Sequence, residues 1–156
     1  MSISDRIVVM KAGVVQQTGK PQEVYDDPVN LFVAKFLGTP PINVFQGKIK
    51  NGKVCIGDAA VLDAPGQKDR DVFVGIRPEG FLLKEDGPLI CQLGGVEVMG
   101  RDISIVSNHE ASLNPNIRSI ISAETKVDTS SEIVRFAVKP SKLFVFDGSS
   151  EERIRI

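Results

Sequence analysis

The sequence contains no tryptophan, one tyrosine, one histidine and two cysteines in 156 residues. Cys55 and Cys91 stand singly, no C-x-x-C pair occurs, and His109 is the single histidine. A zinc site needs a cluster of such ligands, so we expect no metal ligands in this chain. We expect both cysteines to be ordinary half-buried thiols, because free cysteine behaves as a small apolar residue.

Long apolar runs and an excess of one charge are also missing. No stretch approaches the roughly 18 residues of a membrane helix. The start "MSISDRIVVM" sets Asp5 and Arg6 beside a short apolar run, unlike a signal peptide. The net charge of −1 argues against a nucleic-acid-binding module, which usually has a basic face. We therefore expect a cytoplasmic location and no nucleic-acid partner.

The sequence offers no convincing catalytic motif. "GVVQQTGKP" (13–21) resembles a phosphate-binding P-loop, but five residues separate Gly13 from Gly19, and Pro21 replaces the magnesium-binding hydroxyl residue. The neighbouring acids Glu79, Glu85 and Asp86 fall in turns, where charge is normally solvated. We predict no catalytic and no cofactor-binding residue, and so no enzyme activity for this chain.

Residues 1–38 have a mixed β and helical pattern. "DRIVVMKAG" and "VVQQTG" predict two short strands that turn at Gly13, and Pro21 opens a short helical stretch, "PQEVY". A second helix is expected in "DDPVNLFVAKFLG", with Asp27 as its cap, Pro28 at its first position and Gly38 at its end. Its apolar residues at helical spacing predict one buried stripe of Val29, Phe32, Val33, Phe36 and Leu37. "GTPPIN" then predicts a stiff linker.

From Val44 onward the pattern is almost wholly β. Turn-forming residues separate the strand candidates, and Asn51-Gly52 gives the strongest hairpin signal. Short strands at this spacing predict a mainly β fold, a small barrel or sandwich. The expected strands are 44–50, 53–56, 71–77, 89–98, 102–107, 117–122, 132–138 and 142–147.

Two stretches repeat one another. "GIRPEGFLL" (75–83) and "AVKPSKLFV" (137–145) match Arg77 with Lys139 and Pro78 with Pro140. Proline donates no hydrogen bond to a strand ladder, so each strand should stop there, with the basic side chain reaching out of the barrel. We expect Arg77 and Glu79 to tie turns together, with a direct interface role as the alternative.

The ordered motifs resemble a known family. "GIRPE" (75–79), "GGVEVMGRDISI" (94–105) and "FAVKPSKLFVFD" (136–147) are similar to the regulatory domain of the ATP-binding subunit of maltose and multiple-sugar type ABC importers. That domain is an OB-fold-like barrel, also called TOBE. The resemblance implies an end of a nucleotide-binding domain at 1–38, a linker at 39–43 and the OB-type domain at 44–156. It marks as structural or interface residues Gly75, Arg77, Pro78, Glu79, Gly100, Lys139 and Pro140.

The same resemblance implies a function. The chain would begin inside the ATPase domain and lack its P-loop, signature and switch histidine, so it would be a regulatory and dimerisation region. The full-length subunit would bind ATP and magnesium, pair with a second copy, and contact membrane permease subunits at the inner face of the membrane. A regulatory protein is a further partner that the family allows.

A rival hypothesis is a small-ligand module, because similar barrels in related ATPases bind molybdate. "SNHEAS" (107–112) and "VDTSSE" (127–132) hold the polar groups that such an oxyanion site favours.

Residues 1–37 carry a further expectation. Since the linker is stiff, we expect this segment to pack on a neighbouring molecule or to stay mobile rather than to fold back.

Overall fold

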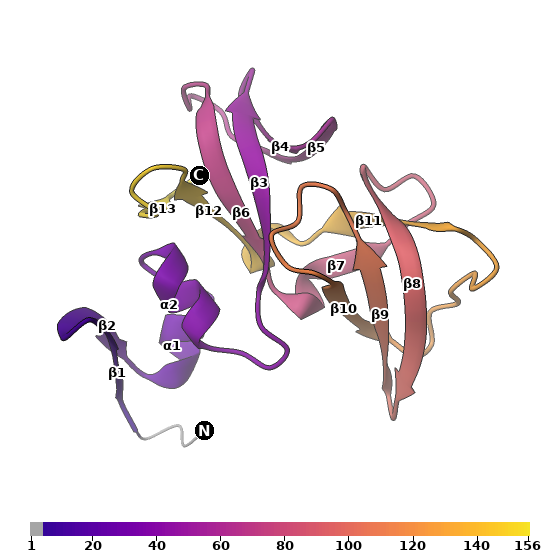
Figure 1. Ribbon diagram of the computed structural model, residues 1–156, viewed down its shortest axis with the longest axis horizontal. Helices are drawn as coiled ribbons and strands as arrows, with labels where there is room; N and C mark the ends of the chain where they lie inside the picture. Colours follow the sequence, from indigo (N-terminus) through magenta and orange to yellow (C-terminus); the bar gives the residue numbers. More distant parts are fainter. Residues whose placement is uncertain (1–4) are drawn as a thin grey trace.

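The chain folds into a small helical segment and two antiparallel β-sheets (Figure 1). The computed structural model describes residues 5–156. The helical segment consists of a hairpin of β1 (Ile7–Lys11) and β2 (Val14–Gly19), followed by α1 (Pro21–Asp26) and α2 (Leu31–Phe36). The predicted hairpin and the helical turn that Pro21 opens are confirmed.

The first large sheet has six strands in the order β13-β12-β6-β3-β4-β5. Asn51 and Gly52 both have positive φ and join β3 to β4, as the sequence predicted for a tight hairpin. The strands are β3 (Asn43–Lys50), β4 (Lys53–Ile56), β5 (Ala59–Asp63), β6 (Arg70–Ile76), β12 (Leu143–Asp147) and β13 (Arg153–Ile154).

The second sheet has five strands in the order β10-β9-β8-β11-β7. They are β7 (Phe81–Leu83), β8 (Leu89–Met99), β9 (Asp102–Asn108), β10 (Ile117–Ser122) and β11 (Ile133–Val138). All eight strands predicted between 44 and 147 are found, with ends that differ by a residue or two. The sequence analysis missed β5, β7 and β13, which are short and carry no clean alternation.

The two sheets enclose one hydrophobic core. Phe81 of β7 and Phe136 of β11 meet edge to face, with ring centroids 5.0 Å apart. Phe45, Val74 and Val145 enter the same core from the six-stranded sheet. The prediction of a mainly β chain with an OB-fold-like small barrel is therefore confirmed.

The chain passes between the sheets at the two repeated motifs. After β6 the single 3₁₀ turn η1 (Pro78–Gly80) leads into β7 of the other sheet, and after β11 the turn η2 (Pro140–Lys142) leads back to β12. Each proline sits at the first position of its turn, where its fixed φ suits the bend. The predicted strand stops at Pro78 and Pro140 are thus confirmed as crossing points.

The predicted start of the second helix is wrong. Asn30 caps α2, because its Oδ1 accepts a hydrogen bond from the Val33 amide at 2.9 Å. Asp27 instead ends α1, and its carboxylate binds Arg153 and Arg155. Gly38 does follow the helix, with φ of +112°.

The predicted stripe is correct for Val33, beside which Phe32 and Leu37 pack, and wrong for Val29 and Phe36. Phe36 is 57% exposed and Val29 is 38% exposed, whereas Leu31, Val33 and Ala34 are buried. The reason is that α2 lies between two apolar surfaces. Leu31 and Ala34 pack with Ile42, Val44, Phe144 and Phe146 of the β domain, and Val33 packs with Val9 and Val24 of the helical segment.

The helical segment therefore folds back on its own chain. Figure 1 shows the hairpin and both helices beside the six-stranded sheet, away from the five-stranded one. This corrects the expectation that residues 1–37 need a second molecule, as far as residues 5–37 are described. The linker residue Ile42 packs against α2, so the linker forms part of the apolar surface on which the helical segment folds back. The domain boundaries at 38 and 44 stay a prediction.

Candidate functional site

Five of the seven residues marked by the sequence lie where the two crossing turns meet. The Arg77 amide donates to the Lys142 carbonyl at 3.0 Å, and the Lys139 amide donates to the Gly80 carbonyl at 2.8 Å. These two bonds join η1 to η2, so Arg77, Pro78 and Glu79 lie beside Lys139 and Pro140. The repeat in the sequence is therefore a pair of turns bonded to each other.

The remaining two marked residues lie elsewhere. Gly75 is in β6, where an added Cβ would lie 2.9 Å from Ile42 Cδ1 and 3.4 Å from Phe146 Cε2. Its lack of a side chain lets Ile42 and Phe146 pack on the strand. Gly100 has φ of +65° in the turn between β8 and β9, far along the chain from the crossing turns, and serves that turn.

The side chain of Arg77 binds the ends of both helices. Nη1 donates to the carbonyls of Ala34 at 2.8 Å and Leu37 at 3.0 Å, and Nη2 donates to the Tyr25 carbonyl at 2.8 Å. The last carbonyls of a helix have no partner within the helix, so one guanidinium satisfies acceptors of α1 and α2 together. Arg77 is 1% exposed, although its side chain leaves the barrel as predicted.

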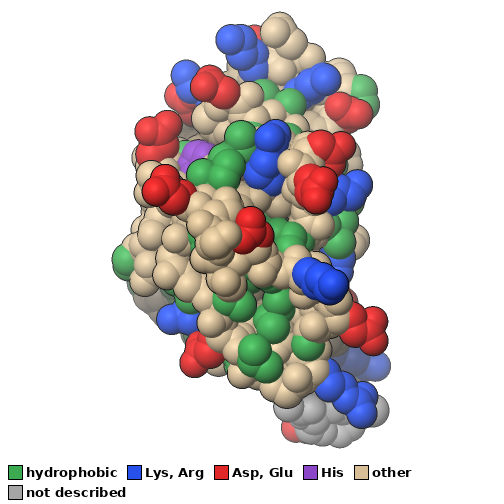
Figure 2. Space-filling model, turned by 90° about the vertical axis from the view of Figure 1, so that its right-hand side faces the viewer, with side chains coloured by type: hydrophobic (Ala, Val, Ile, Leu, Met, Phe, Trp, Pro, Cys, Tyr) green, Lys and Arg blue, Asp and Glu red, His purple; other side chains and the backbone are tan. Residues whose placement is uncertain are grey.

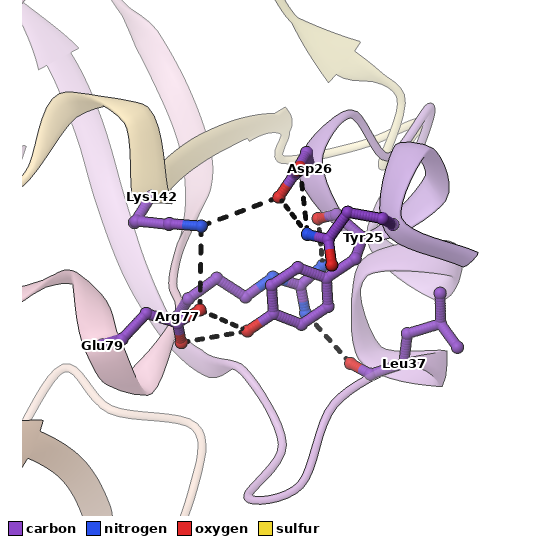
Figure 3. A network of polar contacts seen from close by, with 7 residues as sticks. Tyr25, Asp26, Leu37, Arg77, Glu79 and Lys142 are labelled. Atoms are coloured by element: carbon purple, nitrogen blue, oxygen red, sulfur yellow. Dashed lines mark hydrogen bonds and ion pairs between the residues drawn. The ribbon is translucent and has the colours of Figure 1, made fainter. Parts of the chain in front are cut away.

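An aromatic ring and two carboxylates surround this guanidinium (Figure 3). Cζ of Arg77 lies 3.9 Å from the centroid of the Tyr25 ring, a cation–π distance. The Tyr25 hydroxyl donates to the Glu79 carboxylate at 2.7 Å. Lys142 Nζ lies 3.6 Å from Asp26 Oδ1 and 3.7 Å from Glu79 Oε2, and so bridges the helix to the turn.

Burial governs the ionisation of this group. It lowers the pKa of Arg77, while the nearby Tyr25, Glu79 and Asp26 oppose that effect. An arginine keeps its proton in proteins, so the charge is held by carbonyl dipoles and acidic neighbours. Burial, followed by the hydrogen bond to Glu79, raises the pKa of the Tyr25 phenol well above its ordinary value. The phenol is therefore neutral and acts as a donor.

Lys139, the counterpart of Arg77 in the repeat, has no such role. It is half-buried, and the helical segment is instead contacted by Lys142, three residues later. The sequence analysis missed Tyr25, Asp26 and Lys142. Tyr25 carried one usable signal, because it is the single tyrosine and lies in a stretch predicted to be helical.

Residues considered for other chemistry lie apart from this site. His109 packs edge-on against Phe45, and its Nδ1 accepts from the Ala111 amide. Burial raises the pKa of the Cys91 thiol to about 11, which keeps it protonated. Within residues 5–156 no three His, Cys, Asp or Glu side chains gather as a metal site would require.

In the two segments suggested for an oxyanion, two of the serines already donate to neighbouring groups of the chain. The Ser112 hydroxyl donates to the Asn114 carbonyl, and the Ser130 amide and hydroxyl both donate to Asp128. Asp128 also places a negative charge in the second segment. In the part of the chain that the structure describes, no helix is long and apolar enough to cross a membrane.

Comparisons with known proteins agree with the motifs. No family model matches the chain. It is 33% identical to the oligosaccharides import ATP-binding protein MsmX of Bacillus subtilis, over 99% of this chain and 46% of that protein. The diacetylchitobiose uptake system ATP-binding protein MsiK of Streptomyces coelicolor is 32% identical over 99% of this chain and 47% of its own length. An sn-glycerol-3-phosphate import ATP-binding protein, UgpC, of a Jannaschia species is 31% identical over 99% of this chain and 43% of its own.

The chain thus spans less than half the length of the relatives that it matches. These relatives are import ATP-binding proteins, and the similarity extends over essentially every residue of this chain. The resemblance that the motifs predicted is confirmed: the chain is a relative of the ATP-binding subunits of sugar ABC importers and corresponds to a C-terminal part of them.

Proposed function

We propose that this chain is the regulatory and dimerisation region of the ATP-binding subunit of an ABC importer, with a sugar or sugar derivative as the imported solute. The observation that carries the proposal is the similarity along 99% of the chain to import ATP-binding proteins. Oligosaccharides and diacetylchitobiose are named for two of those relatives, which supports a carbohydrate substrate class.

The proposal assigns no catalysis to this chain. A P-loop with a magnesium-binding hydroxyl is absent from the printed sequence, where Pro21 follows Gly19-Lys20. The buried charge of Arg77 is used to hold helix ends rather than a substrate phosphate. ATP and magnesium would be bound by the remainder of the full-length subunit.

Self-association is the second part of the proposal. Figure 2 looks onto the side where β8 lies in Figure 1 and shows hydrophobic side chains in small groups among charged ones. A non-obligate interface is about as apolar as the rest of a protein surface, so a mixed surface of this kind is compatible with weak pairing. The exposed apolar residues of the five-stranded sheet are Leu82, Ile90, Val98, Met99 and Ile133.

The relatives support a proposed location and proposed partners for the full-length protein. An import ATP-binding subunit must contact membrane permease subunits, so we place the full-length protein in the cytoplasm at the inner face of the membrane. A regulatory protein that binds the β domain is a further proposed partner.

Light scattering over a concentration series tests the regulatory and dimer proposal. The apparent mass should rise from that of a monomer toward that of a dimer, and a constant monomer mass at millimolar concentration would contradict it. Calorimetry with Mg-ATP should give no heat, since the chain has no P-loop. Saturable micromolar binding of molybdate would favour the small-ligand hypothesis instead.

A further inference from the structure

A short C-terminal segment, residues 151–155, lies against the connector between α1 and α2. The Leu31 amide donates to the Glu151 carbonyl at 3.0 Å, and the Arg153 amide donates to the Val29 carbonyl at 3.0 Å. Asn30 and Glu152 form an antiparallel bridge between them. We name residues 151–155 the strap. It includes β13, the last strand of the six-stranded sheet, and links that sheet to the helical segment.

Two arginines of the strap add ionic contacts with the same connector. Arg153 Nη1 donates to Asp27 Oδ1 at 2.9 Å and to the Pro28 carbonyl at 3.0 Å. Arg155 Nη1 donates to the same Asp27 oxygen at 2.7 Å. The hydrogen bond from Arg155, followed by its charge and by Arg153, lowers the pKa of Asp27. The carboxylate is therefore ionised whenever the strap is closed at neutral pH.

The helical segment is thus attached to the β domain by two polar contacts, in addition to the apolar packing of Leu31 and Ala34. Arg77 holds the C-terminal ends of both helices, and the strap holds the connector between them. The ring of Phe144 lies between the two, with Arg77 Cζ 5.6 Å and Arg153 Cζ 4.7 Å from its centroid. Apolar packing is non-directional, so the two polar contacts together fix the orientation of the helical segment.

The two attachments differ in strength. Arg77 is 1% exposed, but the side chains of Arg155 and Asp27 are 62% and 57% exposed. Exposed ion pairs are weak and are screened by salt, while buried hydrogen bonds to a charge are not. Glu151 has φ of +64° in the turn that follows β12, where its amide donates to the Asp147 carbonyl at 2.9 Å.

We propose that the strap is a releasable contact that decides whether the helical segment is fixed or pivots about Arg77. With the strap open, the connector and α2 loosen while both sheets stay folded. Such a device lets the β domain alter the position of the helices without unfolding. The proposal does not depend on the function proposed above, because it concerns contacts within this chain.

Hydrogen exchange of the full chain, followed by mass spectrometry, tests the proposal. Asp27→Ala removes both ionic contacts of the strap and leaves the β domain untouched. Peptides that cover 27–37 should exchange about two- to fivefold faster, because exposed ion pairs contribute little each. Peptides from β6 and β8 should be unchanged. Lys48→Ala is the matched control, since Lys48 forms an exposed ion pair with Asp71 on the same sheet.

Hydrogen exchange at different salt concentrations is a second test, which needs no mutation. Raising the salt concentration should speed exchange of 27–37 in the unmodified chain and have little effect in Asp27→Ala. If Asp27→Ala leaves exchange of 27–37 unchanged, the strap does not hold the segment. If it speeds β6 and β8 equally, the effect is a general loss of stability, and the proposal is wrong.

Discussion

Arg77 and Tyr25 contact each other twice, through different parts of the tyrosine. The guanidinium carbon lies 3.9 Å from the Tyr25 ring centroid, and Nη2 of the same group donates to the Tyr25 carbonyl at 2.8 Å. The side chain and the backbone of Tyr25 therefore both depend on one buried cation. Through the Ala34 and Leu37 carbonyls, α2 depends on it as well.

Replacing Arg77 should strongly destabilise the chain. Arg77→Ala leaves three carbonyls without their donor and should lower the free energy of unfolding by about 3 kcal/mol or more. Urea denaturation measures this change. Arg101→Ala, at an exposed position, is the control and should change little. If Arg77→Ala weakens the dimer more than it weakens the fold, Arg77 acts at the interface instead.

The phenol of Tyr25 should make stability fall at high pH. Its pKa is raised in the fold, so the stabilising effect is complete below the ordinary tyrosine pKa of about 10 and is lost as pH rises above that value. Tyr25 is the only tyrosine, so the ultraviolet absorbance of tyrosinate follows this group alone. A midpoint at the ordinary value in the folded chain would disprove the prediction.

Tyr25→Phe isolates the hydroxyl from the ring. It removes the bond to Glu79 but keeps the surface that Arg77 contacts, so it should cost about 1 kcal/mol, much less than Arg77→Ala. The same variant should lose the part of the alkaline destabilisation that comes from Tyr25. Urea denaturation at neutral and alkaline pH checks both effects.

The close approach of the crossing turns should make Gly80 sensitive to substitution. An added Cβ would lie 2.7 Å from Lys142 Cβ and 3.2 Å from Ile76 Cγ2. Gly80→Ala should therefore destabilise the chain by about 1 to 3 kcal/mol, as overpacking does. Gly95→Ala is the control, because nothing lies within 4 Å of its added Cβ. Equal midpoints of thermal unfolding for the two variants would count against the described packing.

Asn30 should stabilise α2 as its cap. Asn30→Ala should cost about 1 kcal/mol in urea denaturation, and Asn30→Asp should retain most of the stability because its carboxylate can accept from the Val33 amide. A loss in Asn30→Asp as large as in Asn30→Ala would assign the effect to the amide that contacts Gln16.

Much of the fold was predictable because the β-domain strands are bounded by strong turn residues such as Asn51-Gly52 and Pro78. The helix start was mispredicted because Asp27, Pro28 and Asn30 all suit a helix start, and the contact of Asp27 with Arg153 decides between them. That contact joins residues 126 apart in sequence, which no local pattern reveals.

The candidate site was only partly predictable, because several of its residues are brought together by contacts between distant parts of the sequence. The repeat singled out Arg77 and Lys139 alike, but only the fold brings the ends of α1 and α2 to one of them. Tyr25 and Lys142 belong to the site through tertiary contacts. A motif in the sequence therefore located the site without giving its members.

The bond from the Lys139 amide to the Gly80 carbonyl has a consequence for how the domain can vary. The residues between those two, 81–138, contain all five strands of the five-stranded sheet, so that sheet is an insertion whose two ends are adjacent. Insertions with neighbouring ends are well tolerated, because the host chain is not forced apart. The loops of the five-stranded sheet can therefore vary in length while β6 and β12, which flank the insertion in sequence, remain paired.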